Sequence, residues 1–100
     1  MDTEIRQLQS LRLKIAALSE TLAQRELTGR VLRLELEAKK RTAGSTKTDA
    51  ERDAKVDALY LDHEKKSIAL SYDRAVAEAE AESLLLGIRL QIAAMERVEI

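Results

Sequence analysis

The sequence contains no cysteine, no proline, no tryptophan and no phenylalanine, and only three of its 100 residues are glycine. Without cysteine the chain forms no disulfide bond and no zinc–cysteine or iron–sulfur site. Without proline, and with glycine this rare, little in the chain interrupts a helix. The only aromatic residues are Tyr60 and Tyr72. These absences argue against a compact mixed fold and in favour of long helices.

What the chain does contain is aliphatic and charged residues, at 45% hydrophobic and 35% charged. Such a composition with helical periodicity is typical of coiled coils and long helices. Residues 42–47 (Thr-Ala-Gly-Ser-Thr-Lys) are the one clear helix-breaking segment. We therefore expect an all-α fold of two long helices, about residues 3–41 and 49–98, joined by a loop at 42–48. They would fold back on each other as a helical hairpin or coiled coil, with residues 1–100 forming a single domain.

The first expected helix has an apolar stripe at steps of three and four residues, made of Ile5, Leu8, Leu11, Ile15, Leu18 and Leu22. Beyond it, Arg25 and Gly29 stand where apolar residues are due. A displaced second stripe follows, made of Leu27, Val31, Leu34 and Ala38. A helix with two apolar faces contacts two neighbours. Glycine in a helix interior costs about 1 kcal/mol relative to alanine, so we interpret Gly29 as a small residue at a tight crossing, with a functional hinge as the alternative.

The second expected helix begins at Asp49, because Thr48-Asp49-Ala50-Glu51 matches a capping box. It meets no stop signal before Val98, and its length of about 75 Å exceeds what the first helix covers. Its end is apolar on several faces and needs to be buried by other copies of the chain. The residues assigned to oligomerisation are Leu84, Leu86, Ile88, Leu90, Ile92 and Met95, with Val98 and Ile100 beyond them. We expect a homo-oligomeric ring or bundle rather than a simple dimer.

Charge is distributed unevenly, although the net charge is only −1. Between residues 30 and 55 there are eight basic and five acidic residues, a balance of +3, whereas residues 76–100 have two basic and five acidic, a balance of −3. Clustered exposed positive charge is typical of binding to the nucleic-acid backbone. The candidate nucleic-acid-binding residues are Lys39, Lys40, Arg41, Lys47, Arg52 and Lys55. Alternatively, the Lys39–Arg41 triplet stabilises the negative end of the helix dipole.

No catalytic motif or cofactor site is recognisable, so we expect no enzyme activity, no cofactor and no metal. His63 is the only histidine and is interpreted as a seam or surface residue. The segment Gly44-Ser45-Thr46-Lys47 has the wrong order for a phosphate-binding loop. The N-terminal residues lack the pattern of a secretion signal, and the longest apolar stretch, 84–92, is too short to span a bilayer. We therefore expect a cytoplasmic protein without a membrane partner.

Several short motifs of residues 20–98 resemble a known group of proteins. A leucine-rich helix ends in Glu-Ala-Lys-Lys-Arg (37–41), a small glycine loop follows, and Lys47 to Lys55 read Lys-Thr-x-x-Glu-Arg-x-Ala-Lys. Tyr60, several alanines and an apolar C-terminal end come after. This layout resembles small helical proteins of phage recombination modules and is similar in outline to the UvsY-type recombination mediators.

That resemblance implies a ring assembled through C-terminal helices in the cytoplasm of an infected bacterial host. It also implies binding to single-stranded DNA and help in loading a recombinase onto strands coated by single-strand-binding protein. The strand-contacting set would be Lys39, Lys40, Arg41 and Lys47, with Arg52 and Lys55 flanking. Two other hypotheses stay open: a coiled-coil adaptor or inhibitor directed at a host protein, and a structural component of a virion.

Overall fold

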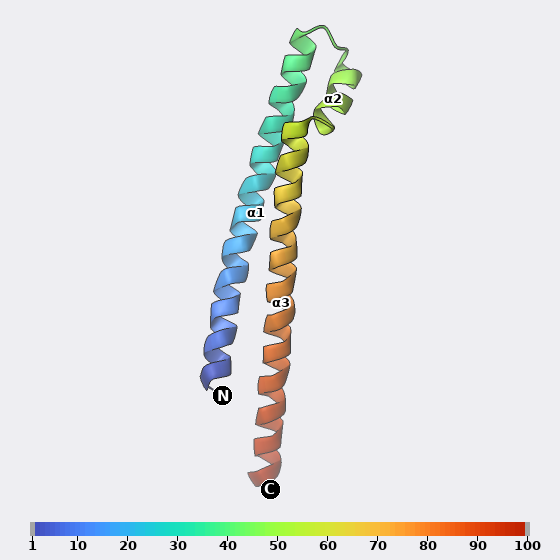
Figure 1. The fold of residues 1–100 in the computed structure, drawn as a ribbon. Helices are drawn as coiled ribbons and strands as arrows, with labels where there is room; N and C mark the ends of the chain where they lie inside the picture. Colours follow the sequence, from blue (N-terminus) through green and yellow to red (C-terminus); the bar gives the residue numbers. More distant parts are fainter. Residues whose placement is uncertain (1, 100) are drawn as a thin grey trace. The chain divides into compact units, whose positions relative to one another are not determined.

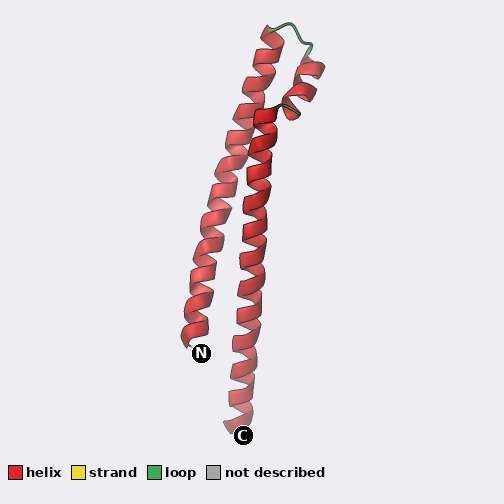
Figure 2. Ribbon diagram, viewed as in Figure 1, coloured by secondary structure: helices red, strands yellow, loops and turns green. Residues whose placement is uncertain are grey.

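The structure, a computed structural model, describes residues 2–99, with the side chains of residues 98 and 99 outside the description. Three helices make up almost all of this range: α1 (Asp2–Thr42), α2 (Lys47–Lys55) and α3 (Ala58–Glu99) (Figure 1). Residues 2–99 contain no strand, and only short connections separate the helices (Figure 2). The all-α prediction and the extent of the first helix are confirmed. Of the expected apolar end, the Val98 side chain and Ile100 lie outside the described residues.

The first connection follows from the glycine that ends α1. Gly44 has a φ of 105°, a left-handed conformation that costs glycine little. In this conformation the Gly44 N–H donates to the Arg41 carbonyl and the Ser45 N–H donates to the Lys40 carbonyl, each at 3.0 Å. The two bonds form a Schellman motif, which satisfies carbonyls that the end of a helix leaves without partners. The break expected at residues 42–48 is therefore real but shorter.

The prediction of one continuous second helix is wrong, because the chain breaks again at Val56 and Asp57. The Val56 and Asp57 N–H groups bond three residues back, to the Asp53 and Ala54 carbonyls, both at 3.3 Å. The Asp57 carboxylate then accepts from the Leu59 N–H at 3.0 Å. Aspartate at this position satisfies a donor at the start of the next helix, so it ends α2 and caps α3 without glycine or proline.

The predicted start of the second helix is also wrong. Thr46 is the N-cap of α2, with extended backbone (φ −69°, ψ 161°), and its hydroxyl accepts from the Asp49 N–H at 3.2 Å. Thr48 lies within the first turn of the helix. Thr46 and Thr48 are both candidates for the N-cap. Thr46, which directly follows the Schellman motif, has the extended backbone that an N-cap requires.

The chain divides into two compact units, each of which packs its own helical segments. Unit 1 consists of residues 1–19 and 72–100, and among its described residues Leu8, Ala77 and Ile88 are buried. Unit 2, Glu20–Ser71, holds the second part of α1, all of α2 and the start of α3. Its buried apolar residues are Leu36, Ala50 and Ala54. The single domain expected from chain length stays a prediction.

Candidate nucleic-acid interface

The basic cluster, Lys39, Lys40, Arg41, Lys47, Arg52 and Lys55, belongs entirely to unit 2. Half of it is close to carboxylates. Lys40 Nζ lies 3.9 Å from Asp57 Oδ2, and Arg52 contacts Asp49 at 3.0 Å and Asp53 at 3.7 Å. These pairs are at least partly exposed, where an ion pair contributes about 0–1 kcal/mol. Their main effect is on the local electrostatic field, because Asp49 and Asp53 of α2 neutralise Arg52, and Asp57, which follows α2, neutralises Lys40.

Lys55 also has acidic surroundings. Together with Arg33, Leu34, Glu37 and Glu51 it lines a depression of about 280 Å³ between α1 and α2. Arg33 Nε lies 3.6 Å from Glu37 Oε1 in the same place. Two cations and two anions share this depression, so it attracts neither a phosphate nor a metal ion strongly.

Three members of the cluster remain available. Lys39, Arg41 and Lys47 are exposed, have no ion-pair partner among residues 2–99, and lie outside the depression that Lys55 shares with two glutamates. The carbonyls at the end of α1 bond to the backbone N–H groups of Ala43, Gly44 and Ser45, so capping does not occupy these side chains. They flank the connection between α1 and α2. We call them the unpaired cations.

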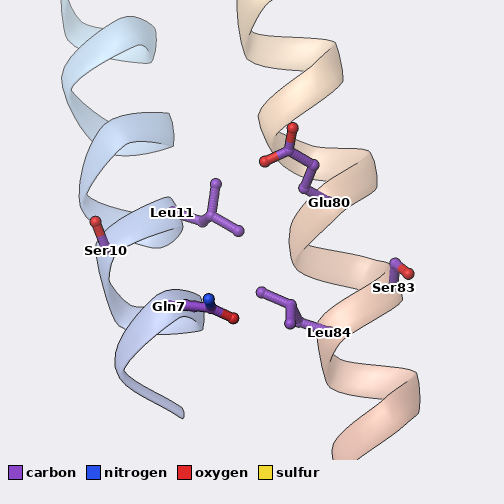
Figure 3. A pocket seen from close by; sticks show the side chains of 6 residues that line it. All are labelled: Gln7, Ser10, Leu11, Glu80, Ser83 and Leu84. Atoms are coloured by element: carbon purple, nitrogen blue, oxygen red, sulfur yellow. The ribbon is translucent and has the colours of Figure 1, made fainter. Parts of the chain in front are cut away.

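The residues assigned to oligomerisation divide into two groups within unit 1. Ile88 is buried and Leu84 is half-buried. Leu84 faces Leu11 across a groove of about 510 Å³ (Figure 3). The groove is also lined by Gln7, Ser10, Glu80 and Ser83. Leu84 thus contributes to the contact of α1 with α3.

The other four residues of that set, Leu86, Leu90, Ile92 and Met95, are exposed. Their exposure continues along α3, because residues 91–97 are all exposed.

The second apolar face predicted on the first helix is present in unit 2. Leu27, Val31 and Leu34 are each more than half exposed, whereas Gly29 and Leu36 are buried. At about 100° per residue, the three exposed side chains lie on the face of α1 opposite the buried one. We call them the outer stripe. Leu61 and Ile68 of α3 are likewise more than half exposed.

Sequence reasoning missed a polar layer in unit 2, formed by Arg25, His63 and Ser67. Arg25 donates from Nε to Ser67 Oγ and from Nη2 to the His63 carbonyl, both at 2.9 Å. His63 Nε2 lies 2.8 Å from the Arg25 carbonyl oxygen. A Cβ on Gly29 would lie 2.9 Å from His63 Nε2, which supports the tight crossing inferred for this glycine. The sequence feature that indicated this layer is the pair Arg25 and Gly29, four residues apart, which interrupts the apolar stripe of the first helix.

No group of three or more histidine, cysteine, aspartate or glutamate side chains within residues 2–99 is arranged to hold a metal ion. None of the described helices combines the length and the apolar character needed to cross a membrane. Comparisons with known protein families, with curated proteins and with solved structures found no match for this chain.

Proposed function

We propose that this chain is a non-enzymatic helical hairpin that self-associates and binds single-stranded DNA through its unpaired cations. The observation that carries the proposal is the grouping of Lys39, Arg41 and Lys47 around one connection, where they are exposed and have no carboxylate partner within the part of the chain that the structure describes. Lysine and arginine neutralise phosphates and release counterions regardless of base sequence. The finer role, assistance in loading a recombinase onto strands coated by single-strand-binding protein, belongs to the same proposal.

Self-association is the second part of the proposal, and the exposed leucines of α3 support it. Leu86 and Leu90 are four residues apart, so they lie on one helix face, and both are more than half exposed. Burying a leucine side chain contributes about 1.5–3 kcal/mol. A second copy of the chain would cover these residues and the exposed residues 91–97 of α3. Three unpaired cations per copy would then become a larger positive surface.

Absolute mass from light scattering tests the assembly. Leu90→Glu is expected to reduce the mass to that of a smaller species, because a charge placed in an apolar interface has no partner there. Arg89→Glu is the matched control: it introduces the same side chain at the neighbouring exposed position and should leave the mass unchanged. A wild-type mass equal to that of the monomer would contradict self-association.

Fluorescence anisotropy with labelled single-stranded DNA tests the cations. The triple variant Lys39→Ala/Arg41→Ala/Lys47→Ala is expected to bind more weakly and to reduce the slope of log K against log salt by about 2, since each phosphate contact adds about 0.7. The control Lys14→Ala/Lys65→Ala/Lys66→Ala removes the same total charge from exposed positions elsewhere. Equal losses in the two variants would mean that net charge, rather than this site, determines binding.

A second candidate function is recognition of a partner protein, and the outer stripe of α1 favours it. Leu27, Val31 and Leu34 follow the spacing at which one helix packs into the groove of another. In a pull-down from host lysate, Leu27→Asp is expected to abolish capture of a stoichiometric partner, whereas the neighbouring exposed control Thr28→Asp is not. Capture of a partner by a protein without DNA affinity would select this function over the first.

A further inference from the structure

In unit 1, one face of α3 carries a regular row of exposed residues. The row follows alternating steps of three and four residues and consists of Val76, Ala79, Ser83, Leu86, Leu90 and Ala93. Such steps repeat every seven residues and keep one face of a helix against a neighbouring helix over several turns. We call these six residues the α3 row.

The α3 row lies opposite the face of α3 that contacts α1. Ala77 and Ile88 are buried on the α1 side, and Leu84 is half-buried there. At about 100° per residue, the α3 row lies on the other side of the helix. Its two leucines, Leu86 and Leu90, are more than half exposed. In unit 1, α3 therefore has a second face for packing, and no residue that the structure describes buries it.

The order of side-chain sizes in the α3 row fits a second copy of the same helix running in the opposite direction. From residue 76 onward the row reads Val, Ala, Ser, Leu, Leu, Ala. Around a two-fold axis at residues 84–85, two antiparallel rows place a smaller side chain opposite a larger one at every level. The facing pairs are Ala93 with Val76, Ala79 with Leu90, and Ser83 with Leu86. Helices interdigitate well when large and small residues alternate in this way across the contact.

A parallel arrangement loses this fit. Each residue would then face its own counterpart, so that Leu86 and Leu90 each meet a leucine while Ala79 meets an alanine and Ser83 a serine. Leucine layers hold two helix axes apart, and the small layers between them are then left with cavities, which are destabilising. The sizes therefore favour the antiparallel direction.

Two charged residues beside the row favour the same arrangement. Glu82 and Arg89 are exposed and form no ion pair among the residues that the structure describes. They are seven residues apart, about 10 Å along the helix axis, so they cannot pair with each other. In the antiparallel arrangement Glu82 of each copy lies beside Arg89 of the other, and the two-fold axis forms this pair twice.

Other alignments of the two rows provide no such pair. Sliding one antiparallel copy by seven residues places Glu82 beside Glu82 in one direction and Arg89 beside Arg89 in the other, and like charges repel. A parallel pair brings Glu82 to Gly87 and Arg89 to Ala94, which carry no charge. Size and charge thus agree on one direction and one register.

We propose that two copies of this chain pair through the α3 row, antiparallel around a two-fold axis at residues 84–85, with Glu82 of each copy beside Arg89 of the other. This inference rests on the proposed self-association and specifies its surface and direction. The leucines provide most of the affinity, because ion pairs at an exposed rim contribute little. The charges determine direction and register, which is the main effect of electrostatic complementarity.

Cross-linking between introduced cysteines tests the direction, because the chain has no cysteine of its own. Val76→Cys and Ala93→Cys keep both leucines, and one variant carries an affinity tag that marks its mass. The two are mixed in denaturant, refolded together and oxidised. The antiparallel pair brings position 76 of one copy opposite position 93 of the other, so disulfides between the two variants are expected. Each variant alone should form few, because equal positions lie about 25 Å apart along the helices.

The possible outcomes separate this inference from the self-association on which it rests. A parallel pair would give the reverse result, with disulfides in each variant alone and none between the variants. That result would overturn the proposed direction, and so would the absence of cross-links in variants whose light-scattering mass shows assembly; neither would contradict self-association itself. A monomeric mass of the wild type would overturn both.

Charge exchange in the same cysteine variants tests the register. Arg89→Glu is expected to lower the yield of disulfides between the variants about fivefold, because two attractive pairs become repulsive. Its mass should stay unchanged, since both leucines are retained. Glu82→Arg/Arg89→Glu reverses both charges and keeps the pairs, so it should restore the yield. Equal yields with and without Arg89→Glu would overturn the proposed register.

Discussion

The two glycines inside helices, Gly29 and Gly87, have opposite surroundings. At Gly29 a Cβ would lie 2.9 Å from the His63 ring, whereas at Gly87 it would meet nothing within 4 Å. Gly87→Ala is therefore expected to raise the free energy of unfolding by about 1 kcal/mol, the intrinsic preference of helices for alanine over glycine. Gly29→Ala displaces His63 and loses hydrogen bonds worth about 1 kcal/mol each, so the net change is a destabilisation.

Urea denaturation of both variants, followed by circular dichroism, measures this difference. The decisive comparison is Gly29→Ala in a His63→Ala background, where the obstructing ring is gone and the alanine should stabilise as it does at position 87. If Gly29→Ala stabilises the otherwise unaltered protein as much as Gly87→Ala does, the close approach of His63 to α1 is wrong.

Part of this residue-scale detail could be predicted from the sequence. The apolar stripe of the first helix indicated that Arg25 and Gly29 are exceptions, and the size of glycine suggested a tight crossing. Their partners, His63 and Ser67, could not be predicted in the same way. The periodicity of one helix shows which face is apolar, but not which residue of another helix lies opposite.

The break between α2 and α3 depends on Asp57, which has two contacts. Its Oδ1 accepts from the Leu59 N–H at 3.0 Å, and its Oδ2 lies 3.9 Å from Lys40 Nζ. Asp57→Ala removes both contacts and is expected to lower the free energy of unfolding by about 1 kcal/mol, a typical cost of losing an N-cap. Asp57→Ser retains a capping hydroxyl without the charge and should remain close to wild type in the same denaturation experiment.

The comparison separates the cap from the ion pair. Lys40→Ala removes only the ion pair, which is partly exposed and at the limit of contact, so its effect should be within about 0.5 kcal/mol. If Asp57→Ser is as unstable as Asp57→Ala, the ion pair rather than the cap holds this junction.

At the scale of elements, the composition predicted the high helical content, and Gly44 predicted the turn that ends the first helix. The second break was missed because it uses neither glycine nor proline. Asp57 followed by Ala58 is an acceptable N-cap sequence, yet it lies within a run that is otherwise strongly helical. Since aspartate can also sit on a helix surface, sequence alone did not distinguish these two roles.

For the whole molecule, the sequence indicated where charge is concentrated but not how much of it is neutralised. The six cations of the basic cluster were predicted from composition along the chain. Only the structure shows that α2 brings Asp49 and Asp53 to Arg52, and that Asp57 reaches Lys40. With three unpaired cations per copy, binding to DNA by one copy should be weak, so the number of copies matters.

Leu90→Glu therefore connects assembly with DNA binding. Leu90 belongs to unit 1 and the unpaired cations to unit 2, so the substitution leaves the cations themselves unaltered. On an oligonucleotide of about 8 nucleotides, within the range that one site covers, the variant and the wild type should bind equally. On a strand several times longer, only the assembled wild type can engage several sites on one strand, and its affinity should exceed that of the variant by about 10²-fold.

Arg89→Glu should behave as the wild type on both strands. Equal affinity of wild type and Leu90→Glu for the long strand would show that copies do not bind DNA together, and would leave the three cations of a single copy as the whole site.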